Sequence, residues 1–193
     1  MFERIASLVT LFSIAFAAFL ALSCGAAPPV SISNKPVSIN DRPVSGINNQ
    51  PKKPIGQMSW TGQDSTIGSI SDYKGKVLIL DFWATFCAPC REEIPHLKSL
   101  KQRYPDDLVL IGLHAGGEED RPKIPAFVSE LRMDYPVAFP EDALLDFVFQ
   151  TDNAIPKTLV IDREGNILRI FTGFDETIGK EIDRITAEAV SRK

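Results

Sequence analysis

Residues 77–83, with the sequence VLILDFW, limit the fold of this chain more than any other segment. Six of these seven residues are apolar or aromatic, and Asp81 is the one polar residue among them. Such a nearly continuous apolar run, without alternation of apolar and polar residues, is typical of a strand buried on both faces, which requires other elements packed above and below it. From residue 55 onward, strand-like and helix-like patterns alternate along the chain. The sequence therefore predicts an α/β domain with a mixed β-sheet flanked by helices.

Apolar spacing and turn residues indicate where the other elements lie. Short β-forming segments predict an N-terminal hairpin, two single strands and a late hairpin, at residues 57–61, 66–69, 108–113, 137–139, 158–161 and 167–171. Helical spacing predicts helices at residues 89–103, 122–133, 141–149 and 175–190.

Residues 1–24 are typical of an export signal. A short n-region is followed by a mostly apolar stretch, which stops at Cys24 without a basic flank. An uncleaved membrane anchor and ordinary cleavage are alternatives, because about 18 apolar residues just suffice to cross a bilayer. The segment LALSC, which ends at Cys24, resembles the lipobox of bacterial lipoproteins, whose cysteine is lipidated. Each alternative places the rest of the chain outside the cytoplasm, and the lipobox implies a lipid anchor in a bacterial envelope membrane.

Residues 25–54 are rich in Pro, Ser and Asn. Frequent prolines disfavour both helices and central strands, so we predict an extended tether here. A loose Val-Ser repeat within it is interpreted as a low-complexity spacer rather than a binding motif. A single domain is then expected over residues 55–193.

Cys87 and Cys90 lie directly after the buried strand, at the start of the next predicted helix. Unpaired N–H groups and the positive end of the helix dipole stabilise a thiolate at Cys87, which lowers its pKa and favours attack on another disulfide. Cys90 is expected to be less exposed and to act as the resolving thiol. Pro89 suits the first turn of a helix. The spacing predicts a redox-active Cys87–Cys90 disulfide.

Other interpretations of the cysteine pair stay open. A Cys-x-x-Cys pair can be half of a zinc site, but a structural site needs two further ligands, and the chain has only His96 and His114 and no second cysteine pair. Zinc or copper binding and an inert structural disulfide are the alternatives to redox chemistry, which itself needs no cofactor or metal. The net charge of −4 gives no reason to expect a nucleic-acid partner.

Residues 75–95, GKVLILDFWATFCAPCREEIP, and residues 154–165, AIPKTLVIDREG, closely resemble two blocks of the TlpA/ResA family of bacterial envelope oxidoreductases. The resemblance implies a thioredoxin-like fold with a strand–helix insertion over residues 115–150. It also implies exchange with protein disulfides, in the role of a reductant supplied by a membrane or envelope partner, for cytochrome c maturation or protein repair. The rival hypothesis is a metal-binding or non-catalytic lipoprotein on the same fold.

The resemblance implies roles for further residues. Pro156 matches the family's cis-proline beside the sulfurs. Asp81 interrupts the apolar strand, where burial raises a carboxyl pKa and makes it a proton acceptor for Cys90; a strand-end aspartate that faces solvent is the alternative. Glu118 lies near the place of a second buried acid that some family members use, offset by one residue, although an exposed loop glutamate is the default interpretation. Phe86 replaces the usual tryptophan and lacks its N–H donor.

Overall fold

The computed structural model describes residues 53–192. The expected export signal, Cys24 and all but the end of the expected tether lie outside this part. The strands are β1 (Ser59–Gly62), β2 (Ile67–Ser69), β3 (Val77–Trp83), β4 (Leu108–His114), β5 (Val137–Pro140), β6 (Lys157–Ile161) and β7 (Ile167–Thr172). The helices are α1 (Ala88–Arg103), α2 (Ile124–Glu130), α3 (Asp142–Val148) and α4 (Glu176–Ser191), with the 3-10 helices η1 (Ile55–Gln57), η2 (Ile70–Tyr73) and η3 (Arg121–Lys123).

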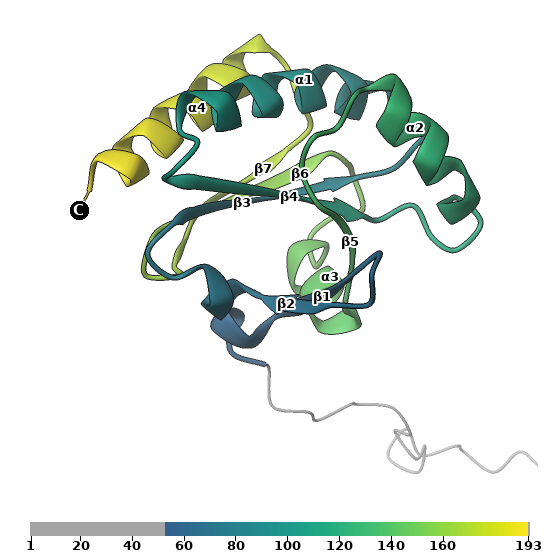
Figure 1. The fold of residues 1–193 in the computed structure, drawn as a ribbon, viewed down its shortest axis with the longest axis horizontal. Helices are drawn as coiled ribbons and strands as arrows, with labels where there is room; N and C mark the ends of the chain where they lie inside the picture. Colours follow the sequence, from purple (N-terminus) through teal and green to yellow (C-terminus); the bar gives the residue numbers. More distant parts are fainter. Residues whose placement is uncertain (1–52, 193) are drawn as a thin grey trace, which may run out of the picture. The chain divides into compact units, whose positions relative to one another are not determined.

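All seven strands form one mixed sheet in the order β2-β1-β5-β4-β3-β6-β7 (Figure 1). β3 pairs in parallel with β4 and antiparallel with β6, and β4 pairs in parallel with β5. The remaining neighbours are antiparallel, including the N-terminal β1–β2 hairpin. Every residue of β3 is buried, as its nearly continuous apolar sequence predicts.

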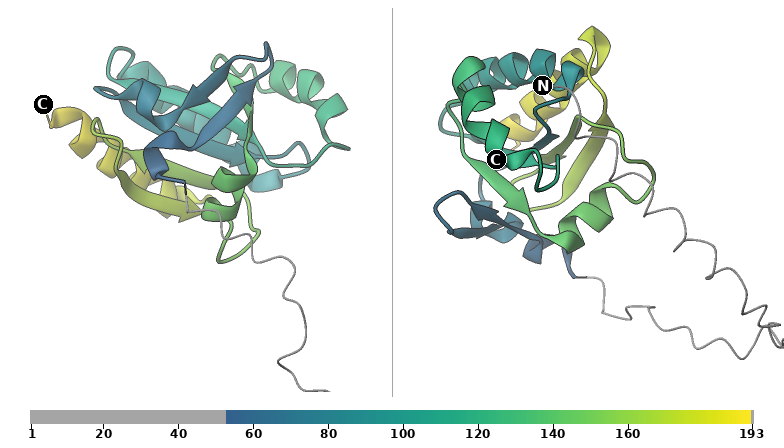
Figure 2. Two further views of the ribbon diagram at one scale, coloured as in Figure 1. Left: turned by 90° about the horizontal axis from the view of Figure 1, so that it is seen from below. Right: turned by 90° about the vertical axis from the view of Figure 1, so that its right-hand side faces the viewer.

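Alternate residues of β3 contribute to two separate cores. Val77, Ile79 and Trp83 face the layer of α1, α2 and α4, whereas Leu80 and Phe82 face α3 and the β1–β2 side. Figures 1 and 2 show α1 and α4 side by side over one face of the sheet, with α3 on the other. Because both faces of β3 are covered, the loop that follows this strand lies at the edge between the sheet and the helices.

The helix expected over residues 122–133 is shorter in the structure, because η3 precedes it and α2 ends at Glu130. Arg132 has φ 47, a left-handed conformation that stops an α-helix. Lys98 Nζ donates to the carbonyl oxygen of Leu131 at 3.0 Å, so one of the last carbonyls is paired from α1. None of the helices in the described part of the chain combines the length and apolar character needed to span a membrane.

Candidate active site

The two cysteines of the dithiol lie where β3 gives way to α1. Cys87 is the N-cap residue of α1 and forms a disulfide with Cys90, their Cα atoms 5.3 Å apart. The backbone N–H of Cys90 donates to Cys87 Sγ at 3.2 Å. The first sulfur therefore meets a backbone N–H at the positive end of the helix dipole, the environment that stabilises a thiolate. Cys87 is 5% exposed and Cys90 is 0% exposed, so both are largely buried and Cys87 is the more accessible of the two.

Two neighbouring segments frame the disulfide. Phe86, just before the first cysteine, is 68% exposed. The Ile155–Pro156 peptide bond is cis, and Pro156 is buried directly before β6, at the end of the sheet where β3 leads into the dithiol loop. Ile155 packs against the core cluster that contains both cysteines. The dithiol thus lies between a projecting aromatic side chain and the loop that enters β6.

Two carboxyl groups lie buried on the α1 side of the sheet. Asp81 is fully buried in β3, and Tyr135 Oη donates to its Oδ2 at 3.4 Å. Glu93 is fully buried in α1, one turn after Cys90, and accepts a hydrogen bond at Oε1 from Thr158 Oγ1 at 2.5 Å. Thr158 lies directly opposite Asp81 in the β3–β6 register. The strand pairing therefore brings the two acids close together between the sheet and α1.

Burial changes the acidity of this pair. It raises the pKa of the Asp81 carboxyl to about 7, against the opposing effect of the Tyr135 hydrogen bond. Burial and the charge of Asp81 raise the pKa of Glu93 well above its usual range, although the bond from Thr158 acts in the opposite direction. Asp81 Oδ1 and Glu93 Oε2 have no hydrogen-bond partner within residues 53–192. A carboxyl group that exchanges its proton near neutral pH suits acid–base work.

Glu118 is not the second buried acid, so that prediction is wrong. Its side chain is 79% exposed and forms an ion pair with Arg121 at 2.9 Å. Glu118 follows Gly117, whose φ of 81 turns the chain outward after β4. The sequence did hold a signal for Glu93, which comes three residues after Cys90 and one before Ile94, on the buried side of α1.

Gly112 makes room for the acid pair. It lies opposite Asp81 in the β3–β4 register. A Cβ atom at this position would lie 2.8 Å from Trp83 Nε1 and 3.0 Å from the Tyr135 ring. Any larger residue would displace the tyrosine that hydrogen-bonds to Asp81.

The two histidines lie in different places. His96 Nε2 is 3.0 Å from Asp183 Oδ1, where α1 meets α4. His114 Nε2 is 3.0 Å from Asp120 Oδ2, at the end of β4. Among the described residues, no group of three or more His, Cys, Asp or Glu side chains is arranged to hold a metal ion.

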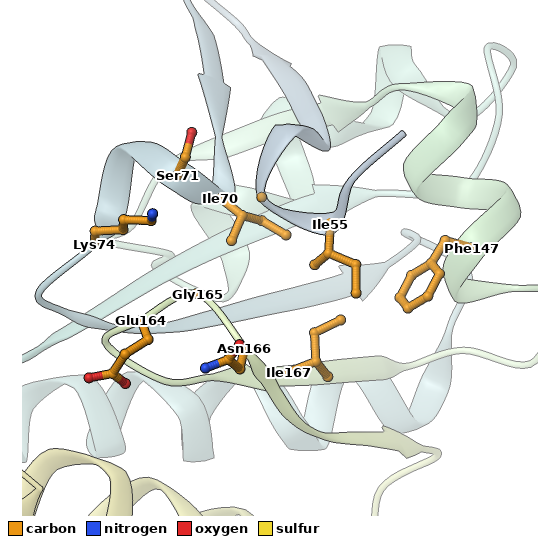
Figure 3. A pocket seen from close by; sticks show the side chains of 10 residues that line it. Ile55, Ile70, Ser71, Lys74, Phe147, Glu164, Gly165, Asn166 and Ile167 are labelled. Carbon is orange, nitrogen blue, oxygen red and sulfur yellow. The ribbon is translucent and has the colours of Figure 1, made fainter. Parts of the chain in front are cut away.

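Two cavities of about 480 Å³ open on the surface. The Phe86 groove adjoins the dithiol and is lined by Phe86, Ala115, Leu145, Asp146, Phe149, Gln150, Asn153 and Ile155. The Ile55 pocket is lined by Ile55, Gly56, Ile70, Ser71, Lys74, Phe147, Glu164, Gly165, Asn166 and Ile167. Figure 3 shows three apolar side chains of this pocket, from η1, α3 and β7, pointing toward one another. Neither cysteine lines either cavity, but Phe86, the residue directly before Cys87, forms part of the wall of the Phe86 groove, which is therefore the candidate substrate site.

Comparison with known families extends this description. Residues 51–170 match the AhpC/TSA family. The chain belongs to this family. It is 30% identical over 107 residues to the thioredoxin-like protein YneN of Bacillus subtilis (strain 168), covering 54% of this chain and 61% of that protein. It is also 30% identical over 107 residues to the thiol-disulfide oxidoreductase ResA of Geobacillus kaustophilus (strain HTA426), covering 54% of this chain and 59% of that protein. The chain thus spans about three fifths of the length of these relatives.

Solved structures show the same fold. A thiol:disulfide interchange protein from Chlorobium tepidum TLS aligns with a TM-score of 0.58 at 25% identity, over 73% of this chain and 99% of that one. The exposed lipoprotein thioredoxin Etrx1 of Streptococcus pneumoniae strain TIGR4 aligns with a TM-score of 0.55 at 25% identity, over 67% of this chain and 97% of that one. The resemblance to ResA-type proteins and the thioredoxin-like fold, with its N-terminal hairpin and its α2-β5-α3 insertion, are therefore confirmed.

Proposed function

We propose that this protein is a thiol–disulfide oxidoreductase that exchanges electrons with protein disulfides through Cys87 and Cys90. The observation that carries this proposal is the asymmetric disulfide pair at the start of α1, in which Cys87 is the N-cap residue and slightly accessible, whereas Cys90 lies inside the helix and is fully buried. The names of the ResA relatives support the same reaction class.

In the first step the Cys87 thiolate attacks one sulfur of a substrate disulfide. A bond forms between Cys87 Sγ and that sulfur, the substrate S–S bond breaks, and the other substrate sulfur leaves as a thiolate that takes a proton from water. The helix terminus favours the attacking thiolate. The product is a mixed disulfide between the two proteins.

In the second step Cys90 resolves the mixed disulfide. Its thiol gives a proton to the buried Asp81–Glu93 pair, and the resulting thiolate attacks Cys87 Sγ. The Cys87–Cys90 bond forms, and the remaining substrate sulfur leaves as a thiolate. Two electrons pass to the substrate, whose disulfide becomes a dithiol. A protein dithiol donor must then reduce the Cys87–Cys90 disulfide to restore the active form.

The Phe86 groove favours a protein segment as substrate. Its walls are largely apolar, with Leu145 and Phe149 from the α3 region facing the side of Phe86 and Ile155. An open groove with apolar walls suits an extended chain beside the reacting disulfide better than a small polar disulfide such as oxidised glutathione.

The experiment that tests the reaction uses insulin reduction by the purified protein with dithiothreitol as electron source. Cys87→Ser is expected to abolish catalysis, because the attacking sulfur is lost. Cys90→Ser is expected to abolish turnover and to accumulate a mixed disulfide that non-reducing electrophoresis detects. Undiminished insulin reduction by Cys87→Ser would exclude the proposed function.

We further propose that the protein works as a reductant outside the cytoplasm, held to an envelope membrane by a lipid on Cys24. The LALSC segment supports this location, and so does the similarity to Etrx1 of Streptococcus pneumoniae, which is described as an exposed lipoprotein thioredoxin. A reductant is expected to have a reduction potential nearer about −270 mV than about −120 mV. Cys24→Ser in the full chain should move the protein from the membrane fraction to the soluble fraction without changing insulin reduction. Retention of Cys24→Ser in the membrane would contradict lipid anchoring.

A further inference from the structure

A second buried pair of titratable side chains lies beside the dithiol loop, and the exchange reaction does not use it. His114 and Asp120 each expose 1% of their side chains, and their Nε2 and Oδ2 atoms are 3.0 Å apart. Asp120 lies in the loop before η3, and His114 is the last residue of β4. The ring of His114 contacts Trp83 edge-on at 5.4 Å between centroids, so the pair adjoins the end of β3.

Asp120 bonds directly to the segment that leads to Cys87. Its Oδ2 accepts the backbone N–H of Thr85 at 2.8 Å, and its Oδ1 accepts the Thr85 hydroxyl at 2.5 Å. Lys123 Nζ also lies 3.2 Å from Oδ1. Burial alone would raise the pKa of Asp120, but the bonds from Thr85, His114 and Lys123 outweigh it and hold the pKa below its usual range. The carboxylate is therefore ionised at neutral pH and makes charge-assisted bonds.

The surrounding backbone closes tightly on this pair. A Cβ atom on Gly116 would lie 2.6 Å from Asp120 Oδ2 and 2.8 Å from His114 Nε2, which only glycine avoids. On the other side of Thr85, the N–H of Cys87 donates to the carbonyl oxygen of Ala84 at 3.2 Å. The turn that carries the attacking sulfur is thus fixed by its own hydrogen bond and by Asp120.

We propose that Asp120, oriented by His114, is a positioning residue that fixes Thr85 and so holds the Cys87 sulfur over the N-terminus of α1. This inference rests on the proposed role of Cys87 as the attacking thiol. The positioning effect of Asp120 and its negative charge have opposite effects on the reactivity of Cys87. A carboxylate near a thiolate repels it, so removing only a charge would make Cys87 more reactive, whereas loosening the turn makes it less reactive.

The test measures the rate at which iodoacetamide alkylates Cys87 in the fully reduced protein at pH 7. Asp120→Ala is expected to slow alkylation about tenfold, because it removes charge-assisted bonds to the loop. Asp120→Asn should restore part of the rate, since its amide oxygen still accepts the Thr85 N–H. Thr85→Val should slow the reaction by a smaller factor, and Thr85→Ser, which keeps the hydroxyl donor, should react like the native protein.

A matched control exists in the same chain. Asp183 lies 3.0 Å from His96 Nε2, but this pair joins α1 to α4 and makes no bond to the dithiol loop. Asp183→Ala should lower the midpoint of thermal unfolding and leave the alkylation rate unchanged. If Asp120→Ala and Thr85→Val both lose thermal stability but are alkylated as fast as the native protein or faster, the positioning role is refuted.

Alkylation needs no disulfide substrate, so the two proposals can fail separately. A native protein that does not reduce insulin but whose Cys87 alkylation still depends on Asp120 would refute the exchange reaction and support positioning. A protein that reduces insulin normally with Asp120→Ala, at an unchanged alkylation rate, would support exchange and refute positioning.

Discussion

Asp81 and Glu93 are buried close together, and their interaction determines how each carboxyl group titrates. Two carboxylates close together in a medium of low polarity do not both ionise readily, so the first proton leaves more easily than the second. The apparent pKa values therefore belong to the pair. In chemical terms, the pair can accept one proton from Cys90 near neutral pH while it retains another.

The first prediction concerns the second step of exchange. Asp81→Asn and Glu93→Gln should each slow resolution of the mixed disulfide by about 10- to 100-fold, the usual contribution of a general base. The attack by Cys87 should keep its rate, because within residues 53–192 the hydrogen bond to Cys87 Sγ comes from the backbone N–H of Cys90 and not from either acid. Quenched-flow mixing with a peptide disulfide, followed by non-reducing electrophoresis, separates the two steps.

Glu92→Gln is the control for this prediction, because Glu92 is the exposed neighbour of Glu93 on the same helix. It should resolve the mixed disulfide at the native rate. Equal slowing in Glu92→Gln and Glu93→Gln would show that the effect comes from the general charge of α1 rather than from proton transfer.

At the scale of elements, α3 separates two apolar surfaces. Leu145 lines the Phe86 groove, whereas Phe147, two residues later, lines the Ile55 pocket (Figure 3). Residues two apart on a helix point in different directions, so one short helix can serve both surfaces. Substitutions in α3 can therefore distinguish contact with a substrate from packing of the helix against the domain.

The second prediction uses that separation. Leu145→Ala should raise KM for a protein disulfide about fivefold through lost apolar contact, with an unchanged rate toward a small aromatic disulfide such as DTNB. Phe147→Ala removes apolar surface from the same helix and should change neither value. A raised KM in both variants would mean that the effect arises from a disturbed helix and not from contact with the substrate.

Sequence patterns predict a helix or strand well where the buried residues of that element follow a regular spacing in the sequence. The run in β3 is apolar because the strand is covered on both faces, and the helical stripe of α1 follows from its contact with the sheet. The end of α2 is less predictable, because a single residue such as Arg132 in a left-handed conformation decides where a helix stops.

The candidate site is only partly predictable from sequence. Asp81 stands out because it is a charged residue within an apolar strand. Cys87 and Cys90 stand out because they follow that strand directly. Glu93 is indicated only by its helical spacing from Cys90, and Asp120 does not stand out, because its burial depends on a loop closure that brings distant residues together. Glu118 illustrates the opposite error, since a position close in sequence to a buried strand end faces solvent.

The third prediction concerns the stability of the whole molecule. An aspartate in an unfolded chain titrates near pH 4, whereas the pKa of Asp81 in the fold is about 7. Between these values the folded protein holds a proton that the unfolded chain has lost. The stability linked to Asp81 is therefore fully present below about pH 4 and is lost as pH rises through about 7, and the raised pKa of Glu93 extends the loss upward.

Asp81→Asn should therefore flatten the fall in stability between about pH 4 and about pH 7. From pH 5 to pH 9, the free energy of unfolding of the native protein should fall by on the order of a few kcal/mol more than that of Asp81→Asn. Urea denaturation of the oxidised protein at both pH values measures this difference. Asp146→Asn, at an exposed position on α3, should follow the native curve, and an Asp81→Asn curve parallel to the native one would show that Asp81 is ionised in the fold.

In the proposed mechanism, the burial of Cys90 also affects how long a partner protein stays attached. Because Cys90 is fully buried, it releases the partner only by attacking Cys87 Sγ, so the lifetime of a covalently captured partner depends on the movement that brings the two sulfurs together at the first turn of α1. A change that slows this movement prolongs capture without altering how partners are chosen. Residence time and partner preference could thus change independently in evolution. Changes at the start of α1 would alter residence time, and changes in the Phe86 groove would alter partner preference.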